Sequence, residues 1–158
     1  MDGKLFLEKE RSEPNLTMND LIIQHAEEKD QPYIDEKLKK YLLDAEDAEW
    51  CRFFVAKHEG RTVAFGRVID HGGYFEVASL GVDYYFRKKG IGNKMLLFLV
   101  GEAKRIDPEK DMYGVTHRPG FLVKAGFEEI PEGPETLEYK RHHKCKLDAS
   151  KIKIMKLK

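Results

Sequence analysis

The chain has 158 residues, enough for one ordinary domain with a buried core, and its 41% hydrophobic and 35% charged composition is typical of a soluble globular protein. Lys+Arg and Asp+Glu both number 28, and this zero net charge argues against a generally basic nucleic-acid-binding protein. The balance is regional. Residues 1–50 hold 7 basic and 14 acidic side chains (net −7), residues 51–140 hold 14 and 13 (net +1), and residues 141–158 hold 7 and 1 (net +6).

Membrane insertion and secretion are not expected from this sequence. The chain opens without a positive segment followed by an apolar one, as a secretory signal would have. The longest apolar run, Met95–Val100, is far too short to cross a bilayer. Two cysteines, Cys51 and Cys145, do not make a disulfide framework. We therefore expect a reduced cytoplasmic protein.

The first fifty residues predict one strand and two helices. Lys4–Glu8 has the pattern of a short strand. A helix is predicted from Asn15 to about Lys29, with Thr17 and Asp20 as its start signal and Leu21, Ile22 and His25 on one face. A second helix begins at Pro32, with apolar residues at helical spacing at Ile34, Leu38, Tyr41 and Leu42. Their acidic side chains form either a solvated face or a surface that attracts a cationic substrate.

The middle of the chain changes to the pattern of a sheet. Three segments rich in β-branched and aromatic residues are separated by short turn signals, which predicts consecutive antiparallel strands at Cys51–Lys57, Thr62–Ile69 and Tyr74–Val82. A long helix follows and ends before Asp107-Pro108. The rest predicts a strand, a short helix and two final strands, at Met112–Thr116, Gly120–Ala125, Phe127–Ile130 and Thr136–Lys140.

The basic tail is the least defined part of the sequence. Its His142-His143-Lys144-Cys145 run lacks a closed tetrahedral ligand set, so no metal site is expected. Lys151–Lys158 alternates apolar and basic residues, which favours an edge strand docked on its own domain or on a second copy in a homodimer. A disordered basic tail and an anion or nucleic-acid contact are the alternatives.

The densest chemical signal is Arg87-Lys88-Lys89-Gly90-Ile91-Gly92, where a strand gives way to a helix. Unpaired amides and the dipole at a helix start favour an anion, glycines let the backbone approach it, and three cations add attraction. A dinucleotide fingerprint fails because Met95 stands at its third glycine, and the Gly-Lys-Ser/Thr of a Walker loop never occurs. Two interpretations remain: an acyl-coenzyme A loop of the form R-x-x-G-x-G, or a basic helix start that binds no ligand.

The surroundings of the loop favour the coenzyme A interpretation. Leu80 and Val82 extend the motif to L-x-V-x(4)-R-x-x-G-x-G, and Phe121–Phe127 (FLVKAGF) follows one strand later. With these motifs, and with its order of elements, the chain resembles the GNAT superfamily of N-acetyltransferases over roughly residues 4–140. The resemblance implies an α/β (α+β) fold with a central mixed, mostly antiparallel sheet of about seven strands and flanking helices. It implies one domain, 1–140, followed by the tail 141–158.

The resemblance also implies acetyl-CoA as co-substrate and no metal. In that family the strand before the loop carries a bulge, and the pantetheine arm pairs with its backbone. By this match the coenzyme contacts are Leu80, Gly81, Val82, Arg87, Lys88, Lys89, Gly90, Ile91, Gly92 and Asn93. Gly120–Lys124 would line the other side of the coenzyme.

The implied reaction is acetyl transfer to an amine of a small molecule or protein, with a cationic acceptor favoured by the acidic front half. Glu76 stands six residues before Val82, at the general-base position of the histone-acetylating branch. Strand alternation places it on one face with Ala78, Leu80 and Val82. The alternative for Glu76 is a solvated or ion-paired glutamate beside the Gly72-Gly73 turn.

The usual general acid of the family is missing, because Leu122 stands at the position of its tyrosine. Substitutes are Tyr113, Tyr139, Tyr84, Tyr85 and His117, none with a spacing argument. Leu122 therefore keeps open an acyl-CoA-binding regulatory module with little turnover. A third hypothesis is an amino-acid acetyltransferase, for which Arg52, Arg67 and Arg118 would supply the cationic pocket.

Overall fold

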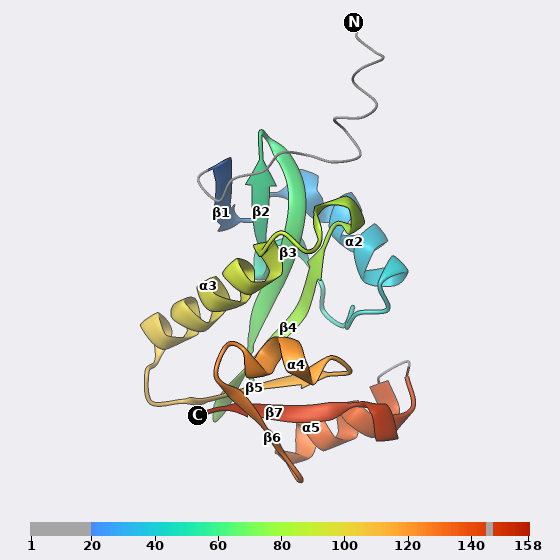
Figure 1. The fold of residues 1–158 in the computed structure, drawn as a ribbon, viewed down its shortest axis with the longest axis vertical. Helices are drawn as coiled ribbons and strands as arrows, with labels where there is room; N and C mark the ends of the chain where they lie inside the picture. Colours follow the sequence, from blue (N-terminus) through green and yellow to red (C-terminus); the bar gives the residue numbers. More distant parts are fainter. Residues whose placement is uncertain (1–19, 145–146) are drawn as a thin grey trace, which may run out of the picture.

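The computed structural model of the chain describes residues 20–144 and 147–158 (Figure 1). In them, seven strands form one sheet in the order β1-β2-β3-β4-β5-β7-β6. Every neighbouring pair is antiparallel except β4 and β5, which are parallel. The expected mixed, mostly antiparallel sheet with flanking helices is confirmed. The strand predicted at Lys4–Glu8 lies outside the described residues.

The strands are β1 (Leu21–His25), β2 (Phe54–His58), β3 (Arg61–Asp70), β4 (Tyr74–Val82), β5 (Asp111–Thr116), β6 (Phe127–Ile130) and β7 (Lys153–Leu157). The α-helices are α2 (Gln31–Lys40), α3 (Ile91–Ile106), α4 (Pro119–Val123) and α5 (Glu135–Tyr139). Short 3-10 turns are η2 (Glu28–Asp30), η3 (Trp50–Arg52), η4 (Tyr84–Phe86) and η6 (Ala149–Lys151), and η5 (Lys140–Lys144) is a π-helical turn. In this part of the chain, no helix has the length and apolar composition needed to cross a bilayer.

Helices cover both faces of the sheet (Figure 1). On one face Leu96 and Leu99 of α3 pack against Phe75 and Val77 of β4, with Leu122 of α4 in the same cluster. On the other face the apolar side of α2 packs on β2 and β3, and α5 packs on β5 and β7. Each fully buried leucine or isoleucine in these clusters stabilises the fold by about 1.5–3 kcal/mol.

The first predicted helix is wrong: Leu21–His25 is the edge strand β1. It pairs antiparallel with β2, from Leu21 opposite His58 to His25 opposite Phe54. The segment LIIQH carries two β-branched residues, and its apolar spacing fits a short strand as well as a helical turn. Pairing with β2 decides between the two. The second helix is confirmed as α2, with Ile34 and Leu38 buried.

The strand predicted at Thr136–Lys140 is also wrong. Residues Glu135–Tyr139 form α5, which begins after Pro134 at its N-cap and continues into η5. Leu137 is fully buried against Tyr113 and Ile154, so this helical turn is fixed on the sheet by one apolar side chain. A proline before the first turn and a glutamate within it are helix start signals, and they outweigh the β-branched Thr136.

The tail does form the expected strand, but its predicted place at the sheet edge is wrong. Strand β7 lies between β5 and β6 and pairs antiparallel with both. Ile154 and Met155 are completely buried on opposite faces. Strand β7 therefore belongs to the core of the sheet, and the edge on this side is β6.

Candidate active site

A bulge interrupts β4 at the point where the coenzyme was expected. The register of β3 against β4 shifts between Phe65 and Arg67, and Ser79 has a φ of +55°, which L-residues rarely adopt. Beyond the bulge, Leu80 and Val82 pack toward α3, whereas Glu76 and Gly81 lie on the α2 and α5 face. The prediction that Glu76 shares a face with Leu80 and Val82 is therefore wrong, because one inserted residue reverses the alternation.

Buried polar groups hold this bulge in place. The Nε atom of Arg67 donates to Ser79 Oγ at 3.0 Å, and Ser79 Oγ donates to the carbonyl of Asp44 at 2.7 Å. Arg67 also donates to the carbonyls of Asp44 and Asp47 and is 2% exposed. The bulge is thereby tied to the loop that follows α2.

Strands β4 and β5 separate beside the bulge. Their parallel ladder runs from Tyr74 opposite Asp111 to Val77 opposite Gly114 and ends there. From Tyr113 to Thr116, β5 pairs with β7 on its other side. Within the described chain, the β5-facing edge of β4 thus has no strand partner from Ala78 to Val82. An extended ligand arm can add to such an edge through main-chain hydrogen bonds.

The predicted phosphate loop lies at the start of α3. Gly90 is the N-cap with a φ of +84°, Lys88 has a φ of +64°, and no side chain caps the helix start. The amides of Ile91, Gly92 and Asn93 therefore begin a 16-residue helix with Lys88 and Lys89 beside them. A Cβ at Gly92 would stand 3.3 Å from Phe121 and 3.5 Å from Val82, so α3, α4 and the end of β4 approach closely here.

Arg87 has a structural role at this loop. Its Nε atom donates to the carbonyl of Val82 at 2.9 Å, and its guanidinium lies 4.5 Å from the ring centroid of Tyr41. The Tyr41 hydroxyl accepts a hydrogen bond from the backbone N–H of Tyr84. Tyr41 thus links the end of α2 to the loop, and the sequence identified it only as a core position.

The missing tyrosine is not replaced within α4. Leu122 is buried in the cluster with α3 and approaches Gly114 of β5. Of the substitutes, Tyr113 is buried against Tyr74 and Leu137. The other four are exposed: Tyr84, Tyr85, His117 and Tyr139.

Glu76 is buried and ion-paired on the α5 face. Its Oε1 atom lies 2.9 Å from His71 Nε2, and its Oε2 atom accepts a hydrogen bond from Lys140 Nζ at 2.5 Å. Lys140 Nζ also lies 2.8 Å from Asp44 Oδ2. One ammonium is therefore held between two carboxylates from distant parts of the chain.

The charges of this group support one another. Burial alone would lower the pKa of Lys140, but the attraction of Glu76 and Asp44 outweighs it and raises that pKa above its usual value. Burial would likewise raise the pKa of Asp44, but the charge and hydrogen bond of Lys140, with Arg67 nearby, lower it. The sequence named Glu76 but missed Asp44, His71 and Lys140, which no motif marks.

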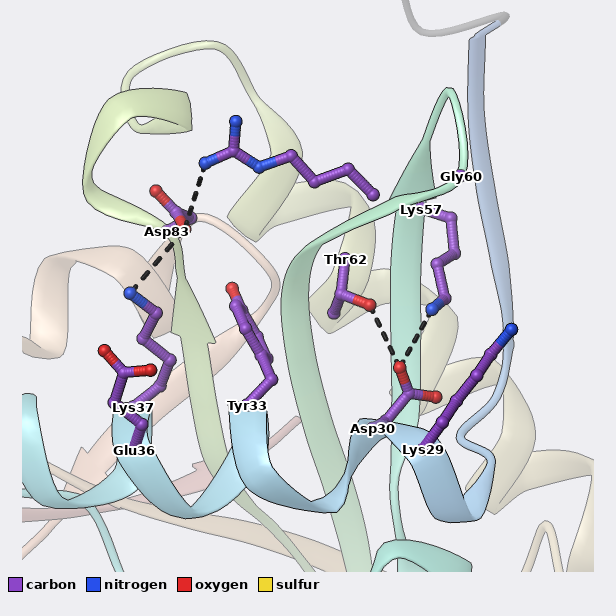
Figure 2. A pocket seen from close by; sticks show the side chains of 10 residues that line it. Lys29, Asp30, Tyr33, Glu36, Lys37, Lys57, Gly60, Thr62 and Asp83 are labelled. Atoms are coloured by element: carbon purple, nitrogen blue, oxygen red, sulfur yellow. Dashed lines mark hydrogen bonds and ion pairs between the residues drawn. The ribbon is translucent and has the colours of Figure 1, made fainter.

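A hollow of about 500 Å³ lies between α2 and the β2–β3 hairpin, away from these residues (Figure 2). Most of the charged side chains that line it are paired with one of two carboxylates. Asp30 accepts hydrogen bonds from Lys57 and Thr62, and Asp83 forms ion pairs with Lys37 and Arg61. None of the predicted site residues lines it. Among the described residues, no group of three or more His, Cys, Asp or Glu side chains is arranged to hold a metal ion.

The chain has a bulged β4, a separation between β4 and β5, and a glycine loop at the start of α3, and it belongs to the GNAT acetyltransferase family. The family model described as "Acetyltransferase (GNAT) domain" matches residues 49–129, about half of the chain. That match spans β2 to β6 and includes the loop and Glu76. No curated protein matches the sequence.

Solved structures share the fold at low sequence identity. One is N-acetylglutamate synthase from Neisseria gonorrhoeae complexed with coenzyme A and N-acetyl-glutamate, with a TM-score of 0.69 and 18% identity over 87% of this chain and 34% of that one. Another is Rv2747 from Mycobacterium tuberculosis in complex with CoA, with a TM-score of 0.68 and 21% identity over 86% and 98%. Escherichia coli ElaA has a TM-score of 0.62 and 15% identity over 87% and 99%.

Proposed function

We propose that the protein is an acetyl-CoA-dependent N-acetyltransferase that acts on a primary amine of a small molecule or protein. The observation that carries this proposal is the combination at the end of β4: an unpaired strand edge runs directly into a helix start with available amides and adjacent cations. Its main-chain groups and charges match an extended pantetheine arm followed by a pyrophosphate. Structures similar to this chain have been solved with coenzyme A.

The residues of the chain divide this binding task. Backbone groups from Leu80 to Val82 pair with the pantetheine arm, and the amides from Lys88 to Asn93 hold the pyrophosphate. Lys88 and Lys89 supply charge, whereas Arg87 orders the loop through Val82. When bound, acetyl-CoA supplies the acetyl group as a thioester.

Glu76 accepts the proton of the acceptor amine in this proposal. A primary amine with a pKa near ~10.4 is mostly protonated at neutral pH and must lose a proton before it attacks the thioester carbonyl. The buried carboxylate of Glu76 is the group at the matching strand position, and His71 links it toward solvent. The thiolate leaves without a tyrosine at position 122, which a thiol pKa near ~8.5 permits.

Release of free CoA thiol from acetyl-CoA tests the function. The purified chain is incubated with a panel of primary amines, including diamines, amino acids and lysine peptides. We expect release above the hydrolytic background with at least one amine. Tight CoA binding without release for any amine would contradict the proposal.

That negative outcome would support a second candidate, an acyl-CoA-binding regulatory module. Two observations favour it: Leu122 is buried where the family's tyrosine stands, and both carboxylate oxygens of Glu76 are already engaged. The Glu76→Gln variant distinguishes the two candidates. A turnover loss at unchanged CoA affinity supports the enzyme, whereas an unchanged background rate with intact CoA binding supports the module.

A further inference from the structure

We propose that the ammonium of Lys140 occupies the position of the acceptor's amino group, between Asp44 and Glu76, and that an acceptor binds by displacing it. The inference rests on the proposed function, because it names the acceptor subsite of the same reaction. It assigns the subsite a ligand class, primary alkylammonium groups. It also makes Lys140 an internal competitor of the substrate.

The geometry around Lys140 Nζ supports this assignment. Two carboxylates approach it, Glu76 Oε2 at 2.5 Å and Asp44 Oδ2 at 2.8 Å, and its side chain is only 15% exposed. A primary ammonium has three N–H donors, and these two oxygens take two of them. The same arrangement would bind the ammonium of any linear amine that enters with its alkyl chain in place of the lysine stem.

The location of this ammonium in the fold also supports the assignment. Asp44 is tied through its carbonyl to Ser79 Oγ, so the subsite adjoins the bulge of β4. Glu76 pairs in register with Tyr113, one residue before the ladder between β4 and β5 ends. Lys140 therefore lies beside the opening where the proposed function places the thioester.

The segment that carries Lys140 has features that favour its displacement. We call residues 135–144, which comprise α5 and η5, the strap. Leu137 anchors its first half in the core, but the second half is a π-helical turn, a rare geometry frequent at functional sites. Within the strap, the Nε atom of Arg141 is buried without a hydrogen-bond partner in the described chain. An outer contact is the exposed pair of Lys144 and Glu46, 3.0 Å apart.

These features allow η5 to leave while α5 stays. Exposed ion pairs such as the one between Lys144 and Glu46 contribute little stability, so their loss opposes opening only weakly. A substrate ammonium between Asp44 and Glu76 would replace the charge that Lys140 withdraws. The buried carboxylates would then never be left unpaired, which is the state that costs most.

Chemical rescue without coenzyme tests the subsite apart from catalysis. Lys140→Ala removes three carbons and the nitrogen, and n-propylammonium has those same atoms. We expect n-propylammonium at ten times its dissociation constant to raise the melting temperature of Lys140→Ala by about 3–6 °C over tetramethylammonium at equal ionic strength. The matched controls are Lys140→Met, which keeps the apolar stem in place, and the double variant Lys140→Ala/Glu76→Gln, and neither should respond.

Equal shifts in all three variants would overturn the proposal, as would no shift in Lys140→Ala up to molar amine. If Lys140→Ala does not fold, hydrogen exchange of the wild-type protein decides instead. We expect n-propylammonium to speed exchange in residues 138–144, and unchanged exchange would overturn the proposal. Rescue without any acetyl transfer would contradict only the proposed function, and transfer without rescue would contradict only this inference.

The competition itself is tested in the transfer assay. If Lys140 competes with the acceptor, Lys140→Ala lowers the KM for the amine by about tenfold, equivalent to about 1.4 kcal/mol of relieved competition. A KM that rises instead would mean that Lys140 helps to bind the acceptor, and this would overturn its role as occupant.

Discussion

The Nε atom of Arg67 donates a hydrogen bond to Ser79 Oγ across β3 and β4, at 3.0 Å. This contact lies at the one place where the two strands lose register, and it joins the strained backbone of Ser79 to a buried cation. The shape of the β4 bulge therefore depends on a side chain from the neighbouring strand β3.

Arg67→Met should lower stability and also weaken coenzyme binding. The substitution removes three hydrogen bonds: it leaves the carbonyl of Asp47 without its donor, whereas Ser79 Oγ and the carbonyl of Asp44 keep only the bond between them. Each lost hydrogen bond costs about 0.5–1.5 kcal/mol. Thermal unfolding and CoA titration check the two effects. Arg52→Met is the matched control, because Arg52 is exposed and should leave both values nearly unchanged. A variant as stable as wild type would show that Arg67 does not hold the bulge.

Gly81→Ala should destabilise the protein by about 1–3 kcal/mol through overpacking. A Cβ at this position overlaps the ring of Phe65, which is fixed in the core beneath α2. Denaturant unfolding measures the loss. Gly101→Ala is the control, because a Cβ at this helical position meets open space. There alanine should raise the free energy of unfolding by about 0.5–1 kcal/mol. Phe65→Leu in the Gly81→Ala background should recover part of the stability, and its failure to do so would rule out the clash.

Lys88→Ala with Lys89→Ala should raise the KM for acetyl-CoA about tenfold, equal to about 1.4 kcal/mol of binding, with little change in kcat. The two lysines contribute attraction to the pyrophosphate rather than transition-state contacts, so added salt should reduce the difference. Steady-state kinetics at two ionic strengths provide the measurement. Lys104→Ala, at the far end of α3, should have no effect. A kcat defect of similar size would place these lysines in the chemical step.

The pair of Asp44 and Lys140 should stabilise the fold over a wide pH range. The folded pKa of Asp44 is lowered, so its contribution is present above the unfolded value near ~3.9 and is lost as the pH falls through the folded pKa. The folded pKa of Lys140 is raised, so its contribution is present below ~10.4 and is lost as the pH rises through the folded pKa.

The wild-type free energy of unfolding should therefore exceed that of Lys140→Met by a nearly constant amount from about pH 5 to about pH 9 and converge toward it outside that range. Urea unfolding at several pH values supplies the comparison. Lys104→Met controls for the loss of one positive charge. A difference that varies strongly between pH 5 and pH 9 would mean that another titrating group controls the pair.

The sequence pattern correctly predicted those elements that depend on residues close to one another in the chain. Strands β2, β3 and β4 follow one another through short turns, and α3 begins at its glycine loop, so the motif and its place could be read from the chain. Strand β1 and helix α5 could not, because their short segments fit both structures and only pairing with β2, or burial of Leu137, decides between them.

The candidate site likewise contains residues that one motif predicts and residues that no local pattern predicts. The proposed coenzyme contacts are contiguous along β4, the loop and α3, so one motif predicts them. Lys140, which donates to Glu76, is 64 residues away from it in the sequence, and Asp44 lies in a loop without regular structure. The bulge also reversed the expected face of Leu80 and Val82, because a prediction from strand alternation assumes that no residue is inserted.

Acetyl transfer to an amine can be followed directly with a ¹³C-labelled acetyl group on acetyl-CoA, using wild-type protein and Glu76→Gln in parallel. We expect a labelled N-acetyl product from the wild type and formation at least roughly 10²-fold slower with Glu76→Gln. The CoA affinity of the variant should stay within about twofold, and its fold should be intact by circular dichroism. No labelled product from the wild type with any amine, or equal rates for the two proteins, would contradict the proposed function.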